Sequence, residues 1–213
     1  MRCAVLGTGM VGRTIAARLS ELGHDVRLGT RDPGATRARD GWVEVPGVEL
    51  VRFAEATSAA DLVVHAGNGA AALDLLAQAG DLTGRVLVDI SNPLDFSAGF
   101  PPTLSVKDTD SLGEQIQRAF PDAFVVKTLN TLTADLMAHP DRLPEPTSVF
   151  VSGDDAEAKR LVTGLLIEMG HRDVIDLGGI DTARGVEMWM PLWLRLMGSL
   201  GTAEFNLKVV RRE

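Results

Sequence analysis

Residues 7–12 form the pattern Gly-Thr-Gly-Met-Val-Gly, and its position between a predicted strand and a predicted helix constrains the fold most strongly. Residues 2–7 are an apolar run that predicts a buried strand. Residues 10–22 carry apolar side chains at helical spacing and predict an amphipathic helix. A G-x-G-x-x-G turn in this position is typical of dinucleotide-binding folds. Its first glycine makes the tight turn, the second admits a pyrophosphate, and the third lets the helix pack on the strand.

Short apolar runs alternate with helical patterns along most of the chain. Further strands are predicted at residues 25–29, 49–53, 62–66, 85–90, 124–128 and 148–151. Helical patterns occupy residues 70–79 and 155–169. Apolar strands separated by helices are typical of a parallel sheet covered on both faces. The sequence therefore predicts an α/β fold, a Rossmann-type doubly wound parallel sheet with a small C-terminal helical extension.

The end of the second predicted strand indicates which dinucleotide binds. NAD sites usually place an acidic residue there, roughly 20 residues past the glycines. Thr30 stands at this end instead, and Asp32 follows two residues later. The Thr30 hydroxyl and the Arg31 guanidinium suit a 2′-phosphate, and Arg37 and Arg39 can add positive charge. This pattern favours NADP(H); the alternative is that the arginines are ordinary surface charges.

Other predicted strands also end in residues that suit a ligand crevice, which in this fold lies outside the carboxyl ends of the strands. Gly67 and Gly69 let backbone approach a ligand, and Asn68 between them can form a hydrogen bond. Asn92-Pro93 is expected to be a cis turn, a wall of the nicotinamide pocket, or an ordinary turn. His65 lies within its strand, so we expect a packed, hydrogen-bonded histidine rather than an acid–base catalyst.

Lys127 and Asn130 are three residues apart, at the end of the strand predicted for residues 124–128. A Lys/Asn pair at this spacing is the catalytic pair of β-hydroxyacid dehydrogenases, where it lies on a helix. Because this pair follows an apolar strand, we favour a structural ion pair for Lys127. No side chain is assigned a certain catalytic role.

Length, charge and cysteine content limit the possible functions. The chain has 213 residues, with 45% hydrophobic and 23% charged residues, and a net charge of −8. An acidic chain is poorly suited to nucleic acids or anionic membranes. The lone Cys3 is expected to be a core residue, and no metal-ligand spacing is present. We find no leader pattern, and residues 186–200 are too polar for a membrane span, so we expect a cytoplasmic protein.

The second half of the chain is expected to add an interface. Residues 1–152 are predicted to form an NADP-binding Rossmann domain, and residues 153–213 a small C-terminal α/β extension. Beyond residue 181 we expect a long apolar helix broken by Pro191, then a terminal strand at residues 205–210. Large apolar side chains within residues 188–194 suit packing on the sheet and on a partner subunit in a homodimer.

Several segments taken together resemble the coenzyme-F420-dependent NADP oxidoreductase family over essentially the whole chain. These segments are residues 7–12, Gly29-Thr30-Arg31, Ser91-Asn92-Pro93, Val126–Thr131, Gly153-Asp154-Asp155, Asp176–Ile180 and Pro191–Leu194. The resemblance implies hydride exchange between NADP(H) and a small-molecule redox acceptor, the 5-deazaflavin coenzyme F420.

The resemblance also implies roles for residues. It places Thr8, Thr30 and Arg31 at the 2′-phosphate, and residues 67–69 with Asn92-Pro93 at the ribose and nicotinamide. The residues expected to bind the cofactor are Gly7, Thr8, Gly9, Met10, Val11, Gly12, Thr30, Arg31, Ala66, Gly67, Asn68, Asn92 and Pro93. The substrate pocket, against the nicotinamide and the deazaflavin, is expected to be lined by Asn130, Thr131 and Leu132.

Two other functions stay open at this point. One is an NADPH-dependent reductase of a flavin or of a small carbonyl or imine substrate, and the other is a non-catalytic NADP(H)-binding sensor. An enzyme is expected to have an open cavity between Asn68, Asn92 and Asn130. A sensor is expected to bind NADP(H) without turnover.

Overall fold

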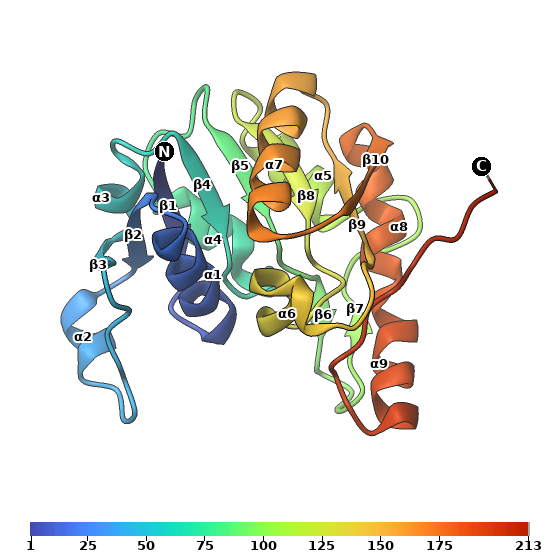
Figure 1. Ribbon diagram of the computed structural model, residues 1–213. Helices are drawn as coiled ribbons and strands as arrows, with labels where there is room; N and C mark the ends of the chain where they lie inside the picture. Colours follow the sequence, from blue (N-terminus) through green and yellow to red (C-terminus); the bar gives the residue numbers. More distant parts are fainter. Residues whose placement is uncertain (213) are drawn as a thin grey trace.

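The computed structural model describes residues 1–212, which form a twisted central sheet with helices on both faces (Figure 1). Over these residues the large sheet has eight strands, in the order β10-β9-β8-β5-β4-β1-β2-β3. Its strands are β1 (Arg2–Leu6), β2 (Asp25–Thr30), β3 (Glu49–Arg52), β4 (Leu62–His65), β5 (Val86–Asp89), β8 (Phe124–Thr128), β9 (Ser148–Ser152) and β10 (Asp173–Gly178). A separate antiparallel hairpin joins β6 (Leu94–Asp95) and β7 (Thr103–Leu104). The predicted Rossmann-type fold is confirmed.

The strand order reverses next to β1, and this reversal locates the ligand crevice. β1 pairs in parallel with β2 on one side and with β4 on the other. The chain first builds β2 and β3 outward from β1, then crosses back to build β4, β5 and β8 in the opposite direction. In doubly wound sheets the ligand binds at the carboxyl ends of the strands beside such a reversal. Leu6, Gly29 and His65 therefore mark the crevice, since they lie in register there.

The sheet is not parallel throughout, which differs from the sequence prediction. β9 runs antiparallel to β8, and β10 runs parallel to β9. The connection over residues 129–147 contains only short helices, so the chain does not cross back to the other end of the sheet. β9 therefore starts at the edge where β8 ends, which gives an antiparallel pair without a crossover. The strand β10 was not predicted from the sequence.

The helices divide between the two faces of the sheet (Figure 1). One face is covered by α1, α6 and α7, and the other by α3, α4, α5 and the start of α8. The α-helices are α1 (Met10–Glu21), α2 (Pro33–Arg37), α3 (Phe53–Thr57), α4 (Ala72–Ala77), α5 (Leu112–Ala119), α6 (Ala134–Ala138), α7 (Ala156–Met169), α8 (Ala183–Met188) and α9 (Met190–Leu200). Short 3-10 helices are η1 (Gly69–Ala71), η2 (Pro140–Arg142) and η3 (Ile180–Thr182).

Strand β1 illustrates how the two hydrophobic cores form. Cys3 and Val5 point to the core under α1 and α7, whereas Ala4 and Leu6 point to the core under α3, α4 and α5. Successive side chains of a strand alternate between faces, so a strand covered on both faces must be apolar throughout. Burial raises the pKa of the Cys3 thiol to about 11. The prediction that Cys3 is a core residue is confirmed.

The C-terminal part agrees with the prediction at Pro191 and departs from it further on. The helical segment is interrupted between α8 and α9, and Pro191 lies in the first turn of α9, where its missing N–H costs no helical hydrogen bond. The predicted strand at residues 205–210 does not form. Ser148 donates its backbone N–H to the Leu207 carbonyl, but the Val209 N–H goes to the Ser148 side chain. The Ser148 hydroxyl thus takes the place of a backbone carbonyl as the partner of Val209. The backbone hydrogen bonds between this segment and β9 therefore do not continue as in a sheet.

A small third core joins α9 to the β6–β7 hairpin. Its buried members are Leu104, Met190, Trp193 and Leu194. Trp193 stacks on Phe205 with ring centroids 5.3 Å apart. Beside this core Phe100 and Leu192 remain exposed, so apolar surface is present where the homodimer interface is predicted. The homodimer and the domain boundary at residue 152 stay predictions. Within residues 1–212, every helix is too short or too polar to cross a bilayer.

Candidate functional site

The three glycines of the loop after β1 have different surroundings. Gly7 has a φ of +127°, and a Cβ there would lie 2.6 Å from the Ala66 carbonyl oxygen. A Cβ on Gly12 would lie 1.9 Å from the Gly7 carbonyl oxygen. At Gly9, by contrast, no atom of the described residues lies within 4 Å of that position. Gly7 and Gly12 therefore close the turn, while the backbone at Gly9 is free to approach a pyrophosphate.

The start of α1 supplies the hydrogen-bond donors for an anion. Gly9 is the residue before the helix and provides no side chain to cap it. The first N–H groups of a helix have no partner within the helix, and the helix dipole favours negative charge beside them. Because the helix starts at the carboxyl end of β1, these donors point into the crevice in which doubly wound folds bind dinucleotides. The structure thus fits the phosphate-binding role predicted for residues 7–12.

Two arginines lie at the outer end of this loop. Arg39 donates from Nη1 to the Thr8 hydroxyl over 3.1 Å, which holds its guanidinium beside the glycine loop. Arg31 follows β2 and is exposed. Its carbonyl oxygen accepts a hydrogen bond from Arg52 at 3.1 Å, so the backbone below Arg31 is anchored. Positive charge therefore gathers at the edge where the sequence predicts the 2′-phosphate.

Two other residues considered for this pocket have partners within the protein. The Thr30 hydroxyl is buried and shares a hydrogen bond of 2.8 Å with the Thr36 hydroxyl. Arg37 donates to Glu44 over 2.7 Å. Thr30 thus fixes the end of β2 against α2, and its own contact with a phosphate stays a prediction.

The ends of β4 and β5 meet on the other side of the crevice. A Cβ on Gly69 would lie 2.1 Å from the Asn92 carbonyl oxygen, so only glycine allows these two segments to approach so closely. The exposed Asn68 accepts from the Ala70 N–H over 3.0 Å, which shapes the turn after β4. The Asn92-Pro93 bond is trans, so the cis alternative is wrong. The turn closes instead through a bond from the Leu94 N–H to the Asn92 carbonyl.

Asn92 and Asn130, called the asparagine pair below, join the ends of β5 and β8. Asn92 donates from Nδ2 to the Asn130 carbonyl over 2.8 Å. Asn130 donates from Nδ2 to Asn92 Oδ1 over 2.9 Å and to the Val186 carbonyl over 3.0 Å. Thr131 and Leu132 are also buried. The two amides therefore contact each other directly, and they form one wall of the crevice. The open cavity expected between Asn68, Asn92 and Asn130 stays a prediction.

Below this wall lies a buried ionic cluster of Lys127, Asp89, Glu187 and His65, called the Lys127 cluster. Lys127 Nζ donates to Asp89 over 2.7 Å and to the Ser91 carbonyl over 2.6 Å, and it lies 2.9 Å from Glu187. The ammonium group is thus held by two hydrogen bonds and by a second ion pair. Burial opposes the charge on Lys127, but the two carboxylates outweigh it and raise its pKa above the ordinary value.

Asp89 is the centre of the Lys127 cluster. Its Oδ1 accepts from His65 Nδ1 over 2.9 Å and from the Ser91 hydroxyl over 2.7 Å. Burial opposes ionisation of Asp89, yet Lys127 and His65 hold its pKa below the ordinary value. The predictions of a structural ion pair for Lys127 and a packed, hydrogen-bonded His65 are confirmed, because both side chains are fully buried and bonded.

Sequence reasoning missed Glu187. In the sequence, Glu187 is one of the charges that make residues 186–200 too polar for a membrane span. Its carboxylate contacts Lys127 and also accepts from the Leu112 and Gly113 N–H groups over 2.8 and 3.1 Å. The one available signal was a single acidic side chain at the start of an otherwise apolar segment.

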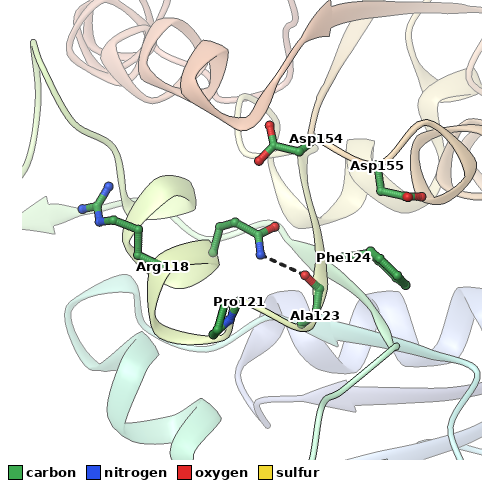
Figure 2. Close-up of a pocket in the computed structure, with 7 residues that line it drawn as sticks. Arg118, Pro121, Ala123, Phe124, Asp154 and Asp155 are labelled. Atoms are coloured by element: carbon green, nitrogen blue, oxygen red, sulfur yellow. Dashed lines mark hydrogen bonds between the residues drawn. The ribbon is translucent and has the colours of Figure 1, made fainter.

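A large cavity lies at the opposite end of the sheet, near the start of β8 (Figure 2). Its volume is about 510 Å³. Its lining residues are Gln117, Arg118, Pro121, Ala123, Phe124, Asp154 and Asp155. Asp155 caps α7 through the Ala158 N–H, and Asp154 accepts from the Ile180 N–H over 2.8 Å. These carboxylates serve the fold, and the cavity lies away from the glycine loop.

The fold and the glycine loop define a doubly wound dinucleotide-binding protein, and known proteins narrow this class. A family model described as NADP oxidoreductase, coenzyme F420-dependent, matches residues 2–93. A crystal structure from Arthrobacter sp. FB24, provisionally named an F420-dependent NADP reductase, is 57% identical with a TM-score of 0.96. It covers 99% of this chain, and this chain covers 100% of it. The chain belongs to the coenzyme-F420-dependent NADP oxidoreductase family and is an NADP-dependent oxidoreductase.

More distant relatives include both stand-alone and larger proteins. The F420-dependent NADP reductase of Methanocaldococcus jannaschii is 26% identical, over 92% of each chain. Metalloreductase STEAP3 of Rattus norvegicus is 29% identical over 87% of this chain. This chain spans only 36% of that protein's length. The likeness to the metalloreductase therefore concerns about a third of that protein.

Proposed function

We propose that this protein transfers a hydride between NADP(H) and the deazaflavin coenzyme F420. The observation that carries the proposal is the state of the acids and bases on the nicotinamide side of the crevice. Lys127, Asp89 and Glu187 are buried and paired with one another, and His65 is bonded to Asp89. A site of this kind suits exchange between two ring cofactors, since the cofactors carry the chemistry and the protein orients them.

The residues of the crevice fit an NADP(H) molecule lying across the strand reversal. Gly9 and the start of α1 would hold the pyrophosphate. Arg31 and Arg39 would hold the 2′-phosphate, and the asparagine pair would form the wall beside the nicotinamide. Bound NADPH would supply a hydride, which is one proton together with two electrons. The chain's own contribution is to fix the ring against this wall and to exclude water from one of its faces.

Reduction of a carbonyl makes a different demand on the site. The oxygen that receives the electron pair also needs a proton from a positioned donor. Lys127 and His65 are both fully buried. Lys127 donates to Asp89 and to the Ser91 carbonyl, and His65 donates its Nδ1 proton to Asp89, so we favour F420 over a small carbonyl or imine acceptor.

The acceptor is tested by rapid mixing. We expect the protein to bind NADPH more tightly than NADH, and its NADPH complex to bleach the absorbance of oxidised F420 within the first turnover. Stopped-flow absorbance measures the bleaching, and the reverse reaction with reduced F420 and NADP⁺ checks the same step. Selective binding of NADPH without bleaching would contradict the F420 assignment. Free flavins and small carbonyl or imine compounds would then be tested, and no turnover with any of them would indicate a sensor.

Arg31 is expected to select NADPH over NADH. A charge-assisted hydrogen bond contributes about 1.5–3 kcal/mol, so Arg31→Ala should weaken NADPH roughly 10- to 100-fold and leave NADH nearly unchanged. Fluorescence titration with both dinucleotides measures the two affinities. Arg37→Ala is the matched control, because Arg37 is on the same segment but pairs with Glu44. Equal losses for NADPH and NADH would show that Arg31 does not contact the phosphate.

A further inference from the structure

Two neighbouring residues of α8 contact the two groups proposed to lie beside the nicotinamide, the Lys127 cluster and the asparagine pair. The Glu187 carboxylate lies 2.9 Å from Lys127 Nζ, at the end of β8. The Val186 carbonyl accepts from Asn130 Nδ2 over 3.0 Å, just beyond that end. Asn130 in turn bonds Asn92 at the end of β5. A single turn of α8 therefore contacts both the Lys127 cluster and the asparagine pair.

Glu187 fixes the position of this turn of α8 relative to α5 and the end of β8. Glu187 is 1% exposed, and its carboxylate pairs with Lys127 and accepts from two N–H groups at the start of α5. A buried carboxylate keeps its charge only beside such partners, so its position is fixed within the reach of their hydrogen bonds. The adjacent Val186 carbonyl is consequently held against Asn130. Without the Val186 carbonyl, one N–H of the Asn130 side-chain amide would be left buried and unbonded.

We propose that Glu187 is a positioning residue for the nicotinamide half of the cofactor. It acts through Val186 and the asparagine pair, which form the wall on that side of the crevice. This inference rests on the proposed function, which places the nicotinamide of NADP(H) beside the asparagine pair. The adenosine half would be bound by the glycine loop and the arginines across the strand reversal, and within residues 1–212 Glu187 contacts neither of them.

The same helix provides a matched control. Arg184 lies one turn before Glu187 and donates from Nε to Glu114 of α5 over 2.8 Å. This pair also joins α8 to α5, and no contact links Arg184 to Lys127 or to the asparagine pair within residues 1–212. If Glu187 served only to dock α8 on α5, then Arg184→Gln and Glu187→Gln would have similar effects on binding.

The test compares NADPH with 2′,5′-ADP, a fragment that keeps the adenosine half and lacks the nicotinamide. For the unaltered protein and for each variant, calorimetry gives the two dissociation constants and their ratio. We expect Glu187→Gln to reduce the preference for NADPH over 2′,5′-ADP about tenfold, which corresponds to one hydrogen bond of ordinary strength. The affinity for 2′,5′-ADP should change less than twofold. Arg184→Gln should leave the ratio unchanged, even where it lowers the melting temperature.

A second variant covers the case in which Glu187→Gln does not fold. Asn130→Ala leaves the Lys127 cluster intact and removes the bonds to Val186 and Asn92, so it should reduce the same ratio. Where both single variants fold, the double variant should have the same NADPH to 2′,5′-ADP preference as Asn130→Ala alone. Glu187 acts on the cofactor only through Asn130, so its loss has no further effect once Asn130 is gone.

Each result decides between the alternatives. A ratio that is unchanged by Glu187→Gln or by Asn130→Ala, or that falls equally in Arg184→Gln, would overturn the positioning role. Fully additive losses in the double variant would overturn it too. Failure of the unaltered protein to bind NADPH would instead overturn the proposed function, and the positioning role with it.

Discussion

Replacement of Lys127 by methionine is expected to lower the free energy of unfolding by about 3–5 kcal/mol, the usual cost of breaking a buried ion pair. Methionine matches the length of the lysine stem but leaves Asp89 and Glu187 without their common counter-ion. For a chain of this size the melting temperature should fall by roughly 6–20 °C. Chemical and thermal denaturation, followed by circular dichroism, measure both quantities.

Lys208→Met is the matched control for this substitution. Lys208 pairs with Glu145 at 3.4 Å, and both side chains are about half exposed or more. A pair of this kind contributes at most about 1 kcal/mol, so the melting temperature of this variant should stay close to that of the unaltered protein. If Lys127→Met were no more destabilising than Lys208→Met, the Lys127 cluster would not contribute to stability as described.

Gly9→Val is expected to abolish dinucleotide binding while leaving the fold intact. Gly9 has extended backbone angles, φ −74° and ψ −177°, which valine adopts without strain. A valine side chain would fill the open space above the loop and keep the pyrophosphate from the N–H groups of α1. Loss of two charge-assisted hydrogen bonds, about 3–6 kcal/mol together, predicts at least a hundredfold weaker binding of both NADPH and NADH.

The control for Gly9→Val is the same substitution at Gly164 of α7. A Cβ on Gly164 likewise meets no atom of the described residues within 4 Å, but α7 lies away from the loop after β1. Gly164→Val should bind both dinucleotides normally. Fluorescence titration gives the affinities, and circular dichroism confirms that each variant is folded. Unchanged affinity in folded Gly9→Val would remove the assignment of this loop as the pyrophosphate site.

Local sequence predicted much of the fold because its signals lie within single segments. Strand β1, the glycine turn and α1 follow one another in residues 2–21, and each has its own periodicity or composition. The antiparallel direction of β9 was not predicted. It depends on whether residues 129–147 cross the sheet, and that connection has no periodic pattern that indicates its path.

The sequence predicted the place of the candidate site correctly, but it was less successful in predicting which side chains are free to contact a ligand. The ends of β1, β2, β4, β5 and β8 were placed correctly at one edge, because parallel strands bring their carboxyl ends together. Thr30 offers a hydroxyl in the sequence, but in the fold Thr36 already bonds it. Asn130 was expected to line an open pocket, but its amide is occupied by Asn92 and Val186. Composition cannot reveal which hydrogen-bonding groups are already occupied.

Local sequence patterns are enough to predict a doubly wound sheet with a dinucleotide-binding turn at its first strand. Which charged side chains meet inside the protein depends on its tertiary packing. Asn130 and Val186 are 56 residues apart in the chain, and Leu112 and Glu187 are 75 residues apart. Helical and strand periodicity act over a few residues, whereas these contacts depend on how α8 packs against the sheet and α5. Because that packing is set by the whole core, no local pattern specifies the partners of Glu187.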